Sequence, residues 1–544
     1  MFGLIMDSPL LISSILEYAA RWHSRVEIVT RTIEGPMHRY TYRDAAQRTA
    51  QLAHALRALG VQQGDRIATL AWNTYRHFEL YYGVSGIGAV LHTANPRLHP
   101  SQIAYIVEHA QDRYVFSDLT FVPILEAIAP ALRGVRGYVI LTGEATMPKT
   151  SLPNVHCYET LLAEQPNAIQ WPVFDERTAS SLCYTSGTTG DPKGVLYSHR
   201  STILHSLSGV GTDQNRRVDR TPCALPLVPM FHVNGWGFPY TAPMMGAKLV
   251  LPGMGYEGKQ IYELMESEKV TSAGGVPTIW YRLLAYLEES GAKLSTLQFM
   301  KVGGSASPPA LIEAFESRGI EVVQGWGMTE TSPVCSSGCL PGEIRDTPER
   351  LSYQLKAGHC LYGVEMKIVD PTGETLPNDG VAVGELCVRG PWVASAYYEN
   401  PQATELAFTA DGWFRTGDLV SINPDGYLTI TDRAKDLIKS GGEWISSIDL
   451  ENVALRHPDV EEVAAIALPH PQWGERPMLV VRRRAGTNVD RDAIVAFLTP
   501  KVAGWWLPDE IAFVDEMPYT ATGKISKKTL RERYARAAQE AATS

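Results

Sequence analysis

Hydrophobic positions in the first quarter of the chain alternate between helical and strand-like spacing. Between residues 42 and 59 apolar side chains recur every three or four positions, which predicts a helix, and Gly60 follows where a helix C-cap favours glycine. The same alternation predicts helices at 76–88, 102–110 and 123–131, and strands at 67–72, 89–93, 114–116 and 138–141. Repeated helix and strand of this kind predicts an α/β fold with doubly wound, parallel sheets.

The pattern changes further along the chain. Residues 142–178 hold four prolines and little periodicity, so we expect them to connect subdomains. Beyond residue 340 short β-rich pieces separated by glycine and proline predict a small barrel or antiparallel sheet. After Asp432 helix and strand alternate again, which predicts a small α+β domain over 432–544 and leaves 1–431 as the large N-terminal domain.

Composition narrows the class of protein. Hydrophobic residues make up 44% and charged residues 20%, as expected for a chain with a sizeable core. The net charge of −10 disfavours a nucleic-acid partner, because phosphate backbones repel an acidic surface. Seven cysteines cannot all pair with one another, and reduced thiols in the cytoplasm are the simpler interpretation.

The apolar start of the chain does not have the pattern of a signal peptide. It lacks a basic segment, carries Asp7 and Glu17, and spaces its apolar residues as an amphipathic helix does. No apolar run is long enough to span a membrane.

Residues 184–194 have the composition of a phosphate-binding loop. Glycines let the backbone approach an anion, hydroxyls donate to phosphate oxygens, and a lysine adds charge. The spacing does not fit a Walker A loop, and a glycine- and threonine-rich surface turn is the alternative. The residues that would bind phosphate are Thr185, Ser186, Gly187, Thr188, Thr189, Gly190 and Lys193.

Three further residues suggest chemistry but have ordinary alternatives. Glu330 follows a glycine-rich turn after an expected strand, where a hard carboxylate suits Mg²⁺, although a lone glutamate in a loop is usually solvated. The Asp418 carboxylate could accept hydrogen bonds from both hydroxyls of a ribose diol, or it could cap a turn. Lys524 is followed by a basic stretch that would also suit a solvated helix.

Together these segments resemble the motifs of the adenylate-forming superfamily, which includes acyl-CoA synthetases, luciferases and peptide-synthetase adenylation domains. The chain is most similar to medium- and long-chain fatty acyl-CoA synthetases and to 3-methylmercaptopropionate-CoA ligases, through Trp236 and through Lys439 to Ile445. The motifs follow the family's order over most of the chain, at 184–194, 229–236, 303–305, 324–331, 413–418, 432–443 and 522–525.

The resemblance implies specific roles around the nucleotide. Glu330 and Thr185 would hold Mg²⁺, and Lys193 and Lys524 would act with them in catalysis. Asp418 and Arg433 would bind the ribose. The remaining ATP- and AMP-binding positions, besides the phosphate loop itself, would be Gly303, Gly304, Ser305, Gln324, Gly325, Trp326, Gly327, Met328 and Thr329.

The resemblance also implies an acyl site, a thioester-forming loop and a hinge. His232, Trp236 and Gly303 would bind the acid, with Trp236 as the gate of an acyl tunnel. The small domain would rotate about Asp432, so that Lys524 serves the first half-reaction and another loop serves the second. The residues implied for the CoA step are Lys435, Lys439, Gly441, Gly442, Glu443 and Trp444.

The implied activity is ATP-dependent ligation of a carboxylic acid to coenzyme A through an acyl-adenylate. We expect a medium-chain fatty acid, with 3-methylmercaptopropionate or another short acid as the alternative. The resemblance also implies a homodimer, and the apolar residues 9–19 are compatible with one. Three other functions share the motifs: an adenylation enzyme that acylates a carrier protein, a luciferase-type oxygenase, and a nucleotide sensor without activity.

Overall fold

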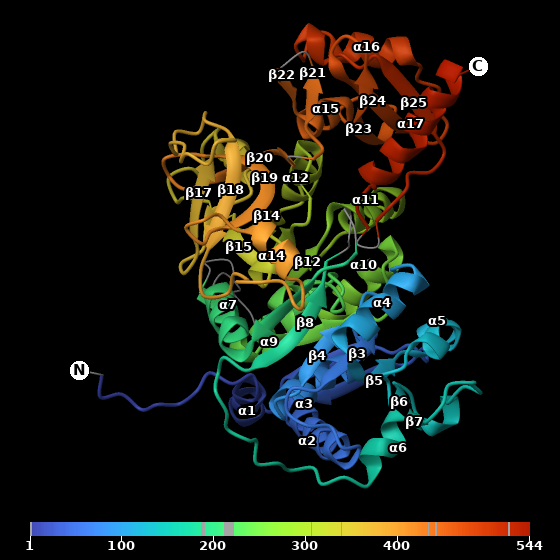
Figure 1. Ribbon diagram of the computed structural model, residues 1–544, viewed down its shortest axis with the longest axis vertical. Coiled ribbons are helices and arrows are strands. Elements are labelled where there is room, and N and C mark those ends of the chain that lie inside the picture. Colours follow the sequence, from blue (N-terminus) through green and yellow to red (C-terminus); the bar gives the residue numbers. More distant parts are fainter. Residues whose placement is uncertain are drawn as a thin grey trace.

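The structure is a computed structural model, and it groups the chain into a large body with a small domain above it (Figure 1). The fold is mixed α/β, as the hydrophobic pattern predicts, with two large sheets, a small antiparallel sheet and the sheet of the small domain. The residues that it describes are 3–185, 191–211, 222–305, 307–338, 340–433, 435–440, 443–520 and 523–543.

The first sheet contains the expected alternation of strands and helices. Its strand order is β7-β6-β5-β3-β4-β8-β9, parallel except for the last pair. The strands are β3 (Arg66–Leu70), β4 (Val90–Thr93), β5 (Asp112–Ser117), β6 (Gly137–Ile140), β7 (Val155–Cys157), β8 (Ala179–Tyr184) and β9 (Gly194–Ser198). α2 (Tyr42–Ala58) precedes β3, and the helices between the strands include α3 (Tyr75–Gly86), α4 (Pro100–Ala110) and α5 (Val122–Ile128).

Local sequence explains the limits of α2. Thr41 and Asp44 form a capping box at its start, and Gly60 after its end has φ of +80°, a conformation that favours glycine. The helix predicted over 42–59 is therefore confirmed.

Residues 142–178, expected to connect subdomains, also contain secondary structure. β7 lies in this segment and pairs parallel with β6, and α6 (Tyr158–Ala163) follows it directly. The strand has three residues, too few for a period to be recognised in a proline-rich stretch.

The second sheet brings distant segments together. Its order is β16-β15-β14-β13-β12-β10-β11-β1-β2, so the two N-terminal strands lie beside a strand more than 200 positions later. The strands are β1 (Glu27–Arg31), β2 (Met37–Thr41), β10 (Cys223–Pro226), β11 (Lys248–Leu251), β12 (Ser272–Gly275), β13 (Phe299–Val302), β14 (Glu321–Gly327), β15 (Val334–Ser337) and β16 (His359–Cys360). Its neighbouring helices include α7 (His199–Gly211), α9 (Phe238–Met245), α10 (Gly258–Glu268), α11 (Pro277–Ser290), α12 (Pro309–Glu316) and α13 (Arg350–Gln354).

The amphipathic helix expected near the N-terminus is present as α1 (Ser13–Trp22). Its apolar stripe, which includes Ile15, Leu16 and Ala19, is buried against α2 and α9. The apolar residues 9–19 therefore pack largely within their own chain, which corrects the expectation that they offer a dimer surface. Residues 3–8 extend away from the body instead, and Figure 1 shows this arm at the N-terminus.

The small antiparallel sheet predicted beyond residue 340 is also present. Its strands lie in the order β17-β18-β19-β20. They are β17 (Glu365–Val369), β18 (Gly384–Arg389), β19 (Phe414–Ile422) and β20 (Leu428–Arg433), with α14 (Pro401–Ala407) between the second and third.

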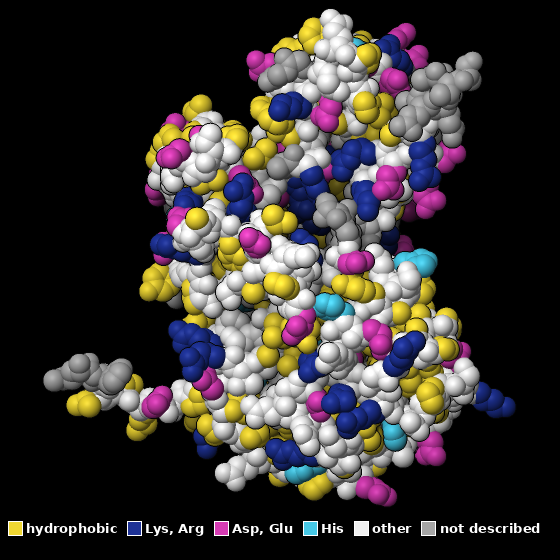
Figure 2. All heavy atoms as spheres, in the orientation of Figure 1, with side chains coloured by type: hydrophobic (Ala, Val, Ile, Leu, Met, Phe, Trp, Pro, Cys, Tyr) yellow, Lys and Arg dark blue, Asp and Glu magenta, His cyan; other side chains and the backbone are white. Residues whose placement is uncertain are grey.

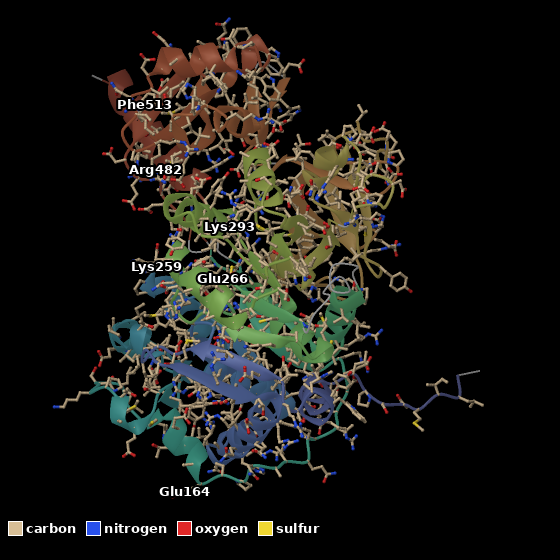
Figure 3. All side chains as sticks on the ribbon, turned by 180° about the vertical axis from the view of Figure 1, so that it is seen from behind. Glu164, Lys259, Glu266, Lys293, Arg482 and Phe513 are labelled. Carbon is tan, nitrogen blue, oxygen red and sulfur yellow. The ribbon has the colours of Figure 1, made fainter. Side chains whose placement is uncertain are left out.

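The chain after β20 forms the small domain. In Figure 3, Arg482 and Phe513 mark this domain at one end of the molecule, and Glu164 lies at the opposite end. Its strands are β21 (Ile438–Ser440), β22 (Glu443–Ile445), β23 (Val460–His470), β24 (Gly474–Arg483) and β25 (Glu510–Val514), and its helices are α15 (Ser447–Ala454), α16 (Arg491–Leu498) and α17 (Lys527–Thr543). In the described part of the chain, no helix is both long and apolar enough to cross a membrane.

Candidate active site

The phosphate loop connects the antiparallel strands β8 and β9. At its two ends, the backbone N–H of Thr185 donates to the Lys193 carbonyl at 2.9 Å, and the Lys193 N–H donates to Thr185 Oγ1 at 3.1 Å. These bonds close the base of the loop. The predicted residues Ser186, Gly187, Thr188, Thr189 and Gly190 lie outside the described part of the chain.

Glu330 lies beside this loop, on the short 3₁₀ turn Thr329–Thr331 that follows β14. Its side chain is buried, and the Tyr397 hydroxyl donates to its Oε1 at 2.6 Å. The Lys193 ammonium lies 4.9 Å from the centre of the Tyr397 ring. Burial raises the pKa of Glu330, and the Tyr397 hydrogen bond and the Lys193 charge oppose that rise.

The predicted ribose pair is formed across two neighbouring strands. Asp418 and Arg433 are directly opposite each other on β19 and β20, and Arg433 Nε lies 3.1 Å from Asp418 Oδ1. The other carboxylate oxygen, Oδ2, accepts a hydrogen bond from Trp326 Nε1 at 2.8 Å. Asp418 is therefore a buried, oriented acceptor rather than a solvated turn residue.

Trp326 itself is buried among apolar residues of the small antiparallel sheet. Its indole positions Asp418, and the expectation that its plane faces adenine stays a prediction. Gly327 has a structural reason to be glycine, because a Cβ would meet the Pro333 carbonyl at 1.9 Å. Gln324 likewise holds the local chain: its Oε1 accepts from the Ser307 N–H and its Nε2 donates to the Gln354 carbonyl.

Lys524 reaches the large domain from the small one. Its side chain lies against Gly304, one of three residues, Gly303 to Ser305, that follow β13. A Cβ placed on Gly304 would be 3.4 Å from Lys524 Cε and 3.8 Å from Nζ. Burial, and then the charges of Arg433 and Lys435, lower the pKa of Lys524 to about 8. Figure 2 shows Lys and Arg side chains gathered where the small domain meets the body. The structure therefore places Lys524 next to the ribose pair.

The acyl-site candidates lie at a strained turn. Val233, Asn234 and Trp236 all have positive φ, and Asn234 is fixed by hydrogen bonds with Thr93 and Ser181. The Trp236 ring closes over Gly303, where a Cβ would meet it at 3.0 Å. Trp236 packs with Ala224, Val228 and Phe238.

His232 precedes this turn. Burial, with smaller contributions from the charges of Lys524 and Arg97, lowers its pKa to about 3, so the imidazole is neutral near pH 7. A neutral ring can exchange hydrogen bonds with a carboxylate without adding charge.

A small cavity behind the Trp236 turn was not anticipated from the sequence. Phe238, Ala273, Phe299 and Lys301 are among the residues that line it. Burial lowers the pKa of Lys301 to about 8. No sequence pattern singles out this lysine, since it lies in an ordinary apolar strand.

Of the described residues expected to serve CoA, three lie on β21 and β22 and one, Lys435, lies near Lys524. Lys439 and Trp444 face each other across β21 and β22, with the ammonium 4.9 Å from the ring centre, and Trp444 is 50% exposed. Glu443 is also exposed, on β22, in the upper part of the small domain in Figure 1. Lys435 is close enough to lower the pKa of Lys524. Gly441 and Gly442 lie outside the described residues.

Asp432 occupies the junction between the two domains. It is buried, and its carboxylate accepts hydrogen bonds from the backbone N–H groups of Ser447 at 2.6 Å and Arg433 at 2.7 Å. Ser447 begins α15, so this side chain links the last strand of the large domain with the first helix of the small one. Its role as a hinge stays a prediction.

The two residues predicted to hold Mg²⁺ do not belong to a larger cluster of metal-binding side chains. Among the described side chains there is no group of three or more His, Cys, Asp or Glu residues that could hold an ion. Glu330 is a hard, buried oxygen donor beside the closed base of the phosphate loop, and the Thr185 hydroxyl lies at that base, which fits Mg²⁺ held jointly with phosphate oxygens.

A glycine- and hydroxyl-rich loop between β8 and β9, a buried carboxylate on the small antiparallel sheet and a lysine from a separate domain are the features expected of a nucleotide-using enzyme. The chain belongs to the AMP-binding enzyme family: the family model matches residues 16–398, and the model of the AMP-binding enzyme C-terminal domain matches residues 449–524.

Individual relatives agree with this membership. The chain is 45% identical to the 3-methylmercaptopropionyl-CoA ligase of Ruegeria lacuscaerulensis, over 98% of this chain and 99% of the relative. It is 44% identical to the medium-chain-fatty-acid–CoA ligase of Ectopseudomonas oleovorans, over 98% of each. The crystal structure of the anthranilate CoA ligase AuaEII in complex with anthranoyl-AMP superposes with a TM-score of 0.87 at 26% identity, covering 98% of this chain and 99% of that one. The resemblance inferred from the motifs is confirmed.

Proposed function

We propose that the protein is an AMP-forming acyl-CoA synthetase that joins a carboxylic acid to coenzyme A through an acyl-adenylate. The observation that carries the proposal is the position of Lys524 over Gly304, beside the ion pair of buried Asp418 with Arg433. A cation held there can face both the acid and the α-phosphate of ATP. Membership of the AMP-binding enzyme family supports the same reaction.

In the first half-reaction a carboxylate oxygen attacks the α-phosphorus of ATP, and the bond to pyrophosphate breaks. Asp418 binds the ribose, and Lys193 with the hydroxyls of the phosphate loop binds the phosphates. Lys524 stabilises the negative charge that develops on the oxygens of the acid and the α-phosphate. A compact ammonium interacts strongly with such charge in a site that holds little water. Neutral His232 orients the acid by hydrogen bonding.

Mg²⁺ is part of the proposal. Glu330 and Thr185 would hold it, and when bound it supplies positive charge to the phosphate oxygens. The buried Glu330 carboxylate, oriented by Tyr397, supports this assignment.

In the second half-reaction the CoA thiolate attacks the acyl carbon, and AMP leaves with the former carboxylate oxygen. Lys439, Glu443 and Trp444 are exposed on β21 and β22 in this structure, whereas Lys524 lies against Gly304 of the large domain, which supports a rotation of the small domain, over residues 432–544, between the two steps. Asp432 is the proposed hinge, and Lys435, Gly441 and Gly442 belong to the proposed CoA-step set.

The acid is proposed to be a medium-chain fatty acid. The apolar surroundings of Trp236, with Ala224, Val228 and Phe238, support an acyl chain, and the relative from Ectopseudomonas is named for medium chains. 3-Methylmercaptopropionate is the second candidate, because another relative of equal similarity is named for it. An adenylation enzyme that acylates a carrier protein is the remaining alternative.

We further propose that the enzyme acts in the cytoplasm as a homodimer. The six described cysteines are all free, as in proteins of reducing compartments. Leu4, Ile5 and Met6 are almost fully exposed on the N-terminal arm, where a second copy would cover them.

The experiment is a comparison of acids. AMP and acyl-CoA formation should be measured with straight-chain acids from acetate to palmitate and with 3-methylmercaptopropionate, each with and without CoA. The proposal expects AMP and thioester in equal amounts, and the highest kcat/KM for a medium-chain acid. A maximum for 3-methylmercaptopropionate would select the second candidate, and no acid-dependent AMP would contradict the reaction.

A further inference from the structure

One short segment of the chain, residues 394–398, contacts both Glu330 and the end of the phosphate loop. The Ala394 N–H donates to the Glu330 carbonyl at 2.7 Å, and the Tyr397 hydroxyl donates to the Glu330 carboxylate at 2.6 Å. At its other end the Tyr398 N–H donates to the Gly194 carbonyl at 2.8 Å. This segment therefore joins two parts of the phosphate site that belong to different sheets.

The Tyr397 side chain makes the central contact. Its hydroxyl binds Glu330 while its ring face lies 4.9 Å from the Lys193 ammonium, so one residue touches both charged groups. Burial, and then the Glu330 charge, raise the pKa of Tyr397, which keeps the hydroxyl protonated and able to donate. The Tyr397 N–H in turn donates to Thr404 Oγ1 at 3.0 Å, which anchors the residue to the start of α14.

A second contact fixes the same turn from the opposite side. The Tyr197 hydroxyl on β9 donates to the Thr329 carbonyl at 2.5 Å. The backbone around Glu330 is thus held both by β9 and by residues 394–398. Because Tyr397 binds one carboxylate oxygen of Glu330, the other oxygen is fixed in one orientation.

We infer that Tyr397 is a positioning residue for metal-dependent ATP binding: its hydroxyl fixes the Glu330 carboxylate, and its ring fixes the Lys193 ammonium. The inference rests on the proposed function, in which these two groups receive MgATP. A carboxylate that is hydrogen-bonded by a neighbour presents its free oxygen in one orientation, and loss of such a partner typically weakens metal affinity.

The test is nucleotide binding without turnover. Isothermal titration calorimetry with ATP plus Mg²⁺, and with ATP plus EDTA, should be done on the full chain in the absence of acid and CoA. Tyr397→Phe keeps the ring, and we expect it to weaken MgATP binding about 10-fold while ATP in EDTA binds as in the wild type. Tyr397→Leu also removes the ring, and we expect it to weaken both.

Tyr398→Phe is the matched control, because it removes a neighbouring hydroxyl and keeps the ring contact with His109 and the backbone hydrogen bond to Gly194. It should bind MgATP as the wild type does. A double variant tests whether Tyr397 acts through Glu330. In a Glu330→Gln background, Tyr397→Phe should not weaken MgATP binding further, because the hydroxyl acts through the carboxylate. Thermal melting should show that Tyr397→Phe remains folded.

Equal MgATP affinities of the wild type and Tyr397→Phe would overturn this inference alone, and so would effects that add fully in the double variant. Equal losses with and without metal would assign Tyr397 to general stability of the fold. A wild-type chain that binds no MgATP would overturn the proposed function as well.

Discussion

The Lys524 side chain lies directly over Gly304, although one residue comes from the small domain and the other from the end of β13. Gly304 has φ of +85°, and a methyl group on it would be 3.4 Å from Lys524 Cε. The backbone conformation favours glycine, and a methyl group would be in van der Waals contact with Lys524 and in tighter contact, at 3.3 Å, with Val276 Cγ1. This contact places a cation from one domain within the nucleotide site of the other.

Gly304→Ala should slow acyl-adenylate formation more than it lowers stability. The added methyl group would press on Val276 at 3.3 Å and remove the free space beside the Lys524 side chain, and the positive φ adds a strain of about 1 kcal/mol. Gly60→Ala is the control, because Gly60 has nearly the same φ, +80°, with nothing within 4 Å of a Cβ. Acid-dependent pyrophosphate release and melting temperature should be measured for both. Equal activity in the two variants would mean that Lys524 does not need this space.

Lys524→Ala should lose the first half-reaction by on the order of 100-fold or more yet still convert supplied acyl-adenylate and CoA to thioester. The pH dependence provides a second check. With a pKa of about 8, the ammonium is present below that pH and is lost as the pH rises through it. The kcat/KM of adenylation should therefore fall above pH 8 in the wild type, and Lys524→Arg should not show that fall. A variant that loses both half-reactions equally would contradict the assignment.

Trp236→Ala should change the preference for acyl chain length more than the affinity for ATP. The ring closes over Gly303 at the proposed tunnel entrance, and one methylene in a pocket is worth only ~1–3 kcal/mol, so the preference should drift over several chain lengths. The measurement is kcat/KM over the acid series. A uniform loss for every acid, with a lower melting temperature, would indicate that the ring only packs the core.

Asp432→Pro should allow adenylate to form but delay the thioester. Proline fixes φ near −65° and would stiffen the connection between β20 and the small domain. Because Asp432 also accepts the Ser447 N–H, Asp432→Ala is needed as a control that removes the carboxylate without restricting the backbone. The two half-reactions should be timed separately by rapid quench. If the alanine variant delays the thioester as much as the proline variant, the carboxylate and not the backbone rotation is responsible.

Local patterns predicted much of the fold. The helix at α2, the alternation that follows it and the antiparallel sheet at β17–β20 each depend on nearby spacing, on caps and on turn residues. The pairing of β1 with β11 could not be predicted, because it depends on contacts between segments far apart in the chain. β7 was missed for a different reason, namely that three residues are too few to show a period.

The candidate site shows the same division. Motifs identified the residues of the phosphate loop, Glu330, Asp418 and Lys524, but not the partners that orient them. Tyr397 lies 67 positions from Glu330, and Trp326 lies 92 positions from Asp418. Contacts between residues so far apart cannot be predicted from a single sequence. The motifs indicate Trp444 as a CoA-step residue, but they do not predict that its side chain is half exposed while Lys524 contacts Gly304.

The central claim is that the acid attacks the α-phosphorus and that AMP leaves with the acid's oxygen. To test it, the enzyme is given a medium-chain acid labelled with ¹⁸O in both carboxylate positions, together with ATP, Mg²⁺ and CoA. Mass spectrometry then measures the ¹⁸O content of each product. The account predicts one labelled oxygen in each AMP and one in each thioester, with none in pyrophosphate. Unlabelled AMP, or label in inorganic phosphate, would show that no acyl-adenylate forms and would contradict the account.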